Sequence, residues 1–219
     1  MKRLIIYCEG PTEESFINNV LAPHLGYSAI SVTPIVYESS RTPLKKHKGG
    51  NYYPKIKKEL SRLCKSDPTA VFTTMFDYYG LSDNTPGVST ASGNIYEKAQ
   101  HVERAIETDL GTKNLFFNLA MHEFEGLLFT DTAAFANITD ADGITKLEKI
   151  KTSFDTPEHI NNSVETAPSK RIENIIKTYS KITNGTIIAE RIGITAIAAE
   201  CKHFSNWLAK IQAHCHSQN

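Results

Sequence analysis

Apolar residues in the first half of the chain gather in short continuous runs, and the first run changes character abruptly at its end. Residues 4–8 (Leu-Ile-Ile-Tyr-Cys) include β-branched and aromatic side chains, which is typical of a short strand buried on both faces. Residues 9–11 (Glu-Gly-Pro) end this strand, because glycine permits unusual backbone angles and proline cannot continue a ladder. Thr12 is predicted to cap a helix whose apolar residues recur at helical spacing from Phe16 to Leu21.

Strand-like runs and amphipathic stretches continue to alternate up to about residue 130. We expect further strands over residues 30–38, 69–76 and 115–119, and helices over residues 53–64 and 95–110. This alternation predicts an α/β fold with a central sheet flanked by helices.

The last third of the chain has a different composition, rich in Asp, Thr, Asn, Lys and Ile up to about residue 184. Shorter helices are expected over residues 144–154 and 169–180. Residues 187–211 are predicted to be helical, with a turn within residues 189–195 between two packed helices and with a C-terminal helix that docks on the core. We therefore predict two domains, an α/β core over residues 1–130 and a helical extension over residues 131–219 that packs on it.

Charge and composition narrow the class of protein. Lys and Arg together number 24 of the 219 residues, and so do Asp and Glu, so any binding to nucleic acid must use local patches. No apolar run approaches the roughly 20 residues of a membrane span, and the N-terminus lacks the layout of a signal peptide. The four cysteines show no Cys-x-x-Cys spacing and indicate reduced thiols in a cytoplasmic protein.

Two acids stand at the turn after the first strand. Glu9 lies at the carboxyl end of the strand, where open α/β sheets bind ligands, and Glu13 lies in the first helical turn. Both side chains can face one point, and converging carboxylates repel unless a cation lies between them; oxygen ligands favour Mg²⁺ or Mn²⁺. The alternative stays open that Glu13 only complements the helix dipole and that Glu9 is a solvated loop residue.

Acids also follow the next two core strands. Asp77 ends the apolar run 69–76, and His122, Glu123 and Glu125 follow the run 115–119. An acid buried at the end of an apolar strand loses its hydration, which costs free energy unless the charge has a partner. A cation shared with Glu9 would offset that cost. If these acids form one site, we expect repulsion to raise at least one pKa when no metal is bound.

Basic residues supply candidate phosphate contacts. Lys45, Lys46 and Lys48 lie in a polar loop that contains glycine. Lys170 and Arg171 lie at the start of a predicted helix, where the helix dipole disfavours positive charge. An anion bound by these two side chains and by the helix amides would explain their position. We predict that these five residues bind phosphate or nucleic acid. A solvated loop and a solvated helix face remain the alternatives.

Five segments together resemble an uncharacterised bacterial toprim-like family, within the toprim superfamily of topoisomerases, bacterial primases and overcoming-lysogenization-defect nucleases. Each segment alone is a weak motif, and the set spans nearly the whole chain. The segments are EGPTE at 9–13, FDYYGL at 76–81, HEFEGLLF at 122–129, APSKRI at 167–172 and CKHFSNWL at 201–208.

The resemblance implies a mainly parallel α/β sheet in which a glutamate after the first strand and an Asp-x-Asp pair after a later one bind Mg²⁺ for phosphoryl transfer. Glu9 matches the glutamate and Asp77 matches the first aspartate, but Tyr79 stands where the second aspartate would be. We expect Glu123 or Glu125 to take the place of that missing acid.

Two hypotheses follow. The first is a Mg²⁺- or Mn²⁺-dependent nuclease of phage defence or DNA repair, with Glu9, Glu13 and Asp77 as catalytic residues and with Glu9, Asp77, Glu123 and Glu125 as metal ligands. In it, Glu13 holds a second ion or acts as a general base. The second, favoured by Tyr79 and the balanced charge, is a non-catalytic toprim-like subunit that binds nucleic acid and partners a genomically adjacent ATPase.

Overall fold

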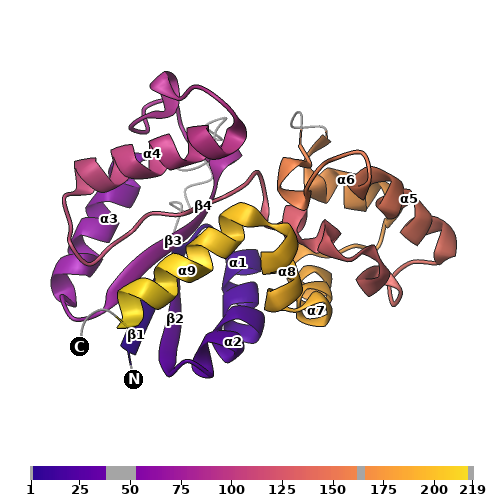
Figure 1. Ribbon diagram of the computed structural model, residues 1–219, viewed down its shortest axis with the longest axis horizontal. Coiled ribbons are helices and arrows are strands. Elements are labelled where there is room, and N and C mark those ends of the chain that lie inside the picture. The colour runs from indigo at the N-terminus through magenta and orange to yellow at the C-terminus, as the bar shows by residue number, and fades with distance from the viewer. Residues whose placement is uncertain (1, 38–52, 162–165, 217–219) are drawn as a thin grey trace, which may run out of the picture.

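The computed structural model describes residues 2–37, 53–161 and 166–216. Within these ranges the centre is a sheet of four parallel strands in the order β2-β1-β3-β4 (Figure 1). The predicted α/β class with a parallel sheet is therefore confirmed. The strands are β1 (Lys2–Cys8), β2 (Ile30–Val36), β3 (Val71–Asp77) and β4 (Leu119–Ala120).

Helices cover both faces of this sheet, which explains why its central strands are apolar throughout. On one face Leu4, Ile6 and Met75 pack against a first helical layer, and on the other face Tyr7 and Phe72 pack against a second. The first layer contains α1 (Pro11–Phe16), the π-helical turn η1 (Ile17–Leu21), α2 (Ala22–Gly26) and α9 (Lys202–His216). The second contains α3 (Tyr53–Ser66) and α4 (Ile95–Leu110).

The remaining helices lie beyond the carboxyl end of the sheet, where α5 and α6 project away from it (Figure 1). None of the helices in the described residues is long and apolar enough to cross a membrane. The α-helices are α5 (Ala141–Lys151), α6 (Pro168–Ile175), α7 (Lys181–Ile192) and α8 (Ile194–Glu200). The 3₁₀ turns are η2 (Tyr78–Gly80), η3 (Val88–Thr90), η4 (Phe124–Thr130), η5 (Thr132–Phe135) and η6 (Pro157–His159).

Two predicted helix boundaries are wrong. The first helix begins at Pro11 and is capped by Gly10, so Thr12 is not the cap. Proline suits this first position, because its fixed φ is already helical and its missing N–H is not needed there. The helical stretch predicted to begin at residue 187 begins at Lys181. The turn predicted within residues 189–195 is confirmed, since Gly193 adopts a φ of 79° between α7 and α8, and Cys201 separates α8 from α9.

The edge strand is shorter than the predicted run 115–119. The backbone groups of Asn118 bond to a side chain of β3 in place of a strand: the Thr74 hydroxyl donates to the Asn118 carbonyl at 2.7 Å and accepts the Asn118 N–H at 2.9 Å. Two amides in the same run are also capped by α4, because Glu107 accepts the Phe117 N–H and Glu103 accepts the Leu119 N–H. Carboxylates therefore cover part of a sheet edge that would otherwise present free donors.

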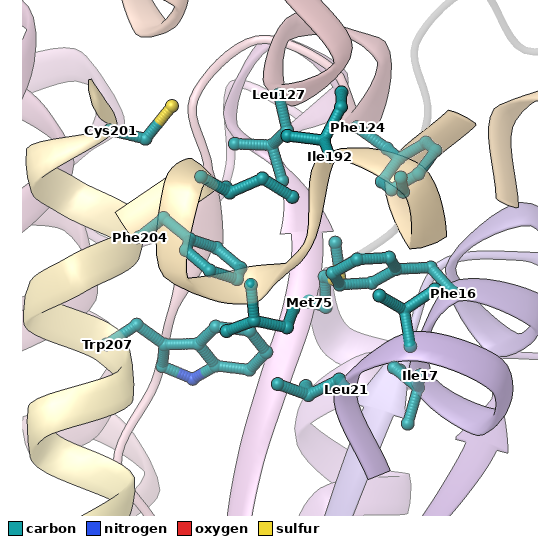
Figure 2. Packing of buried hydrophobic residues seen from close by; sticks show 14 of the residues in the cluster. Phe16, Ile17, Leu21, Met75, Phe124, Leu127, Ile192, Cys201, Phe204 and Trp207 are labelled. Atoms are coloured by element: carbon teal, nitrogen blue, oxygen red, sulfur yellow. The ribbon is translucent and has the colours of Figure 1, made fainter. Parts of the chain in front are cut away.

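One hydrophobic cluster joins the core to the C-terminal part of the chain. Figure 2 shows Phe16 and Met75 of the α/β core with Phe124, Phe204 and Trp207 in this cluster. The indole N–H of Trp207 also donates to the hydroxyl of Thr73 in β3 at 2.9 Å. The boundary at residue 130 stays a prediction, but the two parts share a core.

A buried carboxylate fixes the start of α9. Glu158 is 2% exposed, and its two oxygens accept the backbone N–H groups of His203 and Phe204, each at 2.9 Å. This contact satisfies two of the amides that a helix start leaves without an intrahelical partner.

We predict that Glu158→Ala lowers the free energy of unfolding by about 2 to 4 kcal/mol, because it leaves two buried amides without acceptors. Urea unfolding followed by far-ultraviolet circular dichroism measures this change. Glu190→Ala, at an exposed position of α7, is the matched control and should stay within about 0.5 kcal/mol of the unmodified protein. Equal losses in both variants would contradict the capping role.

Candidate functional site

Carboxylates from three neighbouring strand ends meet at one edge of the sheet. Glu9 follows β1, Asp77 is the last residue of β3, and Glu123 and Glu125 follow β4. Parallel strands in the order β1-β3-β4 place these carboxyl ends side by side. The closest contact is a hydrogen bond in which the amide N–H of Asp77 donates to Glu9 Oε2 at 3.0 Å. With Glu13 from α1, these residues form what we call the acid cluster.

Asp77 lies at the electrostatic centre of the acid cluster. Burial raises its pKa well above the usual range, and the charges of the other four members, Glu9, Glu13, Glu123 and Glu125, raise it further. Its Oδ1 atom is buried and makes no hydrogen bond within the described part of the chain. The expectation that repulsion would raise at least one pKa is therefore confirmed, and Asp77 retains an unsatisfied oxygen.

Glu13 is held in the turn between β1 and α1. It is 8% exposed, and its Oε2 accepts the N–H of Gly10 at 2.9 Å. Burial raises the pKa of Glu13 to about 7, and the charges of Glu9 and Glu125 add to this effect against the opposing hydrogen bonds from the amides of Glu13 and Gly10. Glu13 therefore exchanges a proton near neutral pH.

A cation that the sequence analysis did not select completes the cluster. The ammonium group of Lys181, the first residue of α7, lies 3.3 Å from Glu125 Oε1 and 3.9 Å from Glu123 Oε1. Burial raises the pKa of Glu125, and Lys181 lowers it. One signal was available, because a lysine at a helix start is disfavoured by the helix dipole unless acids lie nearby.

Two further polar groups lie beside these acids and were also missed. The amide of Ser169 donates to Glu123 Oε2 at 3.1 Å, while the Ser169 hydroxyl is buried and makes no hydrogen bond among the described residues. The Tyr179 hydroxyl is also buried without such a bond, and burial followed by the charge of Glu125 raises its pKa. Tyr179 stands at helical spacing from Ile172 and Ile176, and such spacing indicates an apolar contact without showing the polar end of a tyrosine.

His122 adopts a left-handed backbone conformation with a φ of 67° immediately before Glu123. Such a conformation is strained in a residue with a side chain, and strain of this kind is concentrated at functional sites. Burial, and then the nearby His159, lower the pKa of His122 to about 4, so its imidazole is neutral at pH 7.

The predicted phosphate-binding residues make other contacts. Lys170 pairs with Glu173 at 2.6 Å, while Arg171 donates to the carbonyl of Thr166 at 2.7 Å and lies over the ring of Phe154. At this helix start, where an anion was expected, the backbone amide of Ser169 donates to the carboxylate of Glu123. The roles of Lys170 and Arg171 stay predictions, as do those of the three remaining lysines, which lie outside the described residues: Lys45, Lys46 and Lys48.

The acid cluster fits a hard divalent cation in its chemistry, although its side chains are spread. Within the described ranges, no group of three or more His, Cys, Asp or Glu side chains is arranged to hold a metal ion. Asp77 Oδ1 and Glu125 Oε1 are nevertheless buried carboxylate oxygens without a hydrogen bond there, and such oxygens are the ligands that Mg²⁺ and Mn²⁺ prefer. Rotation of the glutamate side chains toward Asp77 is therefore needed for shared coordination.

We predict that the contribution of Glu13 to the stability of the metal-free protein is lost as the pH rises from about 4.5 to about 7, since the pKa of Glu13 is 4.5 in the unfolded chain and about 7 in the folded one. His122, whose pKa is lowered, acts in the opposite direction over nearly the same range, so the Glu13 effect is measured as a difference between variants. Below both values the protonated acid is tolerated equally in each state, and above them the folded state carries the unfavourable charge. The contribution of Glu13 is roughly 3 kcal/mol. Urea unfolding at several pH values measures this slope.

The matched variants are Glu13→Gln and Glu14→Gln. Glu13→Gln retains an acceptor for the Gly10 N–H and should make the dependence of stability on pH less negative than in the unmodified protein, whereas Glu14→Gln, in the same helical turn, should leave that dependence unchanged. A slope unchanged by Glu13→Gln would show that other members of the acid cluster carry the titration.

Comparison with known proteins gives a family without an assigned activity. No curated protein and no solved structure matches the chain. The family model described as a domain of unknown function, DUF4276, matches residues 8–212, a segment that contains all five members of the acid cluster. The chain therefore belongs to the DUF4276 family.

Proposed function

We propose that this protein carries out divalent-metal-dependent phosphodiester chemistry on nucleic acid, as a nuclease-like protein of phage defence or DNA repair in the cytoplasm. The observation that supports the proposal best is the acid cluster at the carboxyl edge of a parallel sheet, with buried oxygens on Asp77 and Glu125 that make no hydrogen bond among the described residues. The resemblance to the toprim superfamily also supports the proposal, because it implies a Mg²⁺ site formed by acids at this edge of the sheet.

Glu9, Asp77 and one of Glu123 and Glu125 are the residues that would hold Mg²⁺ or Mn²⁺. When bound there, the ion supplies charge stabilisation to a phosphate group and lowers the pKa of an attacking water. The backbone amide of Asp77 donates to the Glu9 carboxylate at 3.0 Å, so the backbone of β3 holds the Glu9 carboxylate beside Asp77.

Glu13 is the candidate general base. Its pKa of about 7 suits proton transfer at neutral pH, because a base is most effective when its pKa is near the working pH. Its Oε2 accepts the Gly10 N–H, which holds the carboxylate at this turn beside Glu9. In this proposal the exposed ring of Tyr79 offers a surface for base stacking.

The second candidate is a non-catalytic toprim-like subunit that binds nucleic acid and partners a genomically adjacent ATPase. Two observations favour it: Tyr79 stands where the resemblance would place an aspartate, and no three described acids are arranged to hold an ion. Metal binding without cleavage, or an ATPase gene next to this one, supports this candidate.

We predict cleavage of DNA or RNA in the presence of Mn²⁺ or Mg²⁺, and a loss of at least about 100-fold in Glu9→Gln and in Asp77→Asn, which remove charge from the proposed ligand set. Incubation with supercoiled, linear and single-stranded DNA and with RNA measures the activity. Asp77→Asn should keep or raise stability, because it removes a buried acid, so the loss is not explained by unfolding.

Glu190→Gln, on an exposed face of α7, is the control and should cleave at the rate of the unmodified protein. Cleavage that survives in both Glu9→Gln and Asp77→Asn would identify a contaminating nuclease and remove the enzymatic proposal.

A further inference from the structure

Lys181 occupies a position that only the acid cluster explains. It begins α7, where the helix dipole disfavours positive charge, and its ammonium group faces Glu125 and Glu123 at 3.3 and 3.9 Å. Although burial lowers the pKa of Lys181, the charges of Glu125, Glu123 and Asp77 raise it overall. The lysine is thus a cation drawn into the cluster by the same acids that are proposed to bind metal.

We propose that Lys181 is an internal counter-cation that competes with a divalent metal ion for Glu125 and Glu123, and so sets the metal affinity of the acid cluster. The inference rests on the proposed function, since it requires a metal site at this edge of the sheet. It adds a residue that regulates loading of that site.

Competition follows from the geometry of Glu125. This carboxylate is 2% exposed, and its Oε1 lies 3.3 Å from the Lys181 ammonium group, so the ion pair with Lys181 offsets a buried charge. A metal ion at the usual distance of about 2.1 Å from that oxygen would lie close to the ammonium group. Two cations so near one another repel, and the lysine must move away for the ion to bind.

The lysine can move while its helix stays in place. α7 packs closely against η4: a Cβ atom placed on Gly185 would lie 3.2 Å from the ring of Phe124. The hydroxyl of Thr186 also donates to the Ser15 hydroxyl of α1 at 2.8 Å. These contacts fix the helix. The Lys181 side chain, by contrast, is 40% exposed and has a flexible four-carbon stem, so it can turn toward solvent.

Calorimetric titration of the full chain with Mg²⁺ and with Mn²⁺ tests the inference directly. We expect Lys181→Met and Lys181→Gln to bind the ion roughly tenfold more tightly than the unmodified protein, because each removes the competing charge. Lys181→Gln retains a donor for Glu125 and guards against loss of folding. Lys177→Met, at an exposed position before α7, is the matched control and should leave the affinity unchanged.

The outcomes separate the two proposals. If neither the unmodified protein nor the Lys181 variants bind either ion, the metal site itself fails. If the unmodified protein binds and the Lys181 variants bind equally or more weakly, the metal site stands and the competition is refuted. Tighter binding in both Lys181 variants, with no change in Lys177→Met, supports both.

A second measurement uses the unmodified protein alone. If the ion displaces Lys181, adding Mg²⁺ should raise the rate at which its amine is acetylated, as followed by mass spectrometry of the peptide that contains it. Lys177 provides the internal control and should react at a constant rate. A Lys181 rate that stays constant or falls at a Mg²⁺ concentration that saturates binding would overturn the inference.

Discussion

Repulsion among carboxylates at one sheet edge is the constraint on which the rest of this site depends. The parallel order β1-β3-β4 forces acids that lie far apart in sequence, such as Glu9, Asp77 and Glu125, to the same place. Among the described residues, backbone amides that donate to Glu9 and Glu13 and the ammonium group of Lys181 beside Glu125 offset part of this charge, and protons bind more tightly to the buried acids. A protein that keeps so unfavourable an arrangement is expected to use it.

The surrounding fold is built so that these acids cannot easily move apart. β1 and β3 are buried on both faces, and α9 is tied to β3 through the hydrogen bond between Trp207 and Thr73. Glu158 fixes the start of α9, while Gly185 allows α7 to approach η4. Relaxation is therefore confined to side-chain rotation, which is the freedom that coordination of an ion requires.

Features that depend on the local pattern of residues could be predicted from the sequence. Features that depend on contacts between residues far apart in the chain could not. The first buried strand and the helix over residues 95–110 follow from apolar spacing, and the acids at strand ends follow from where the runs stop. Lys181 was not selected, because its partner Glu125 lies more than fifty positions away and spacing within a helix cannot show such a contact. Asn118 was predicted to lie in a strand but does not, because its backbone groups bond to the Thr74 side chain, a contact that no residue near Asn118 in the sequence indicates.

In the proposed metal site, Tyr79 would remove one ligand and leave most of the negative charge in place. Glu13, Glu123 and Glu125 all act electrostatically on Asp77, so the negative charge that would attract a cation does not depend on a second aspartate beside it. Under this proposal, ligands from another strand would have to rotate into place and displace Lys181. Metal binding would then be linked to proton release, because an ion that binds the raised-pKa acids Asp77 and Glu13 must expel their protons. The tyrosine would therefore affect how the proposed site is loaded more than whether it attracts a cation.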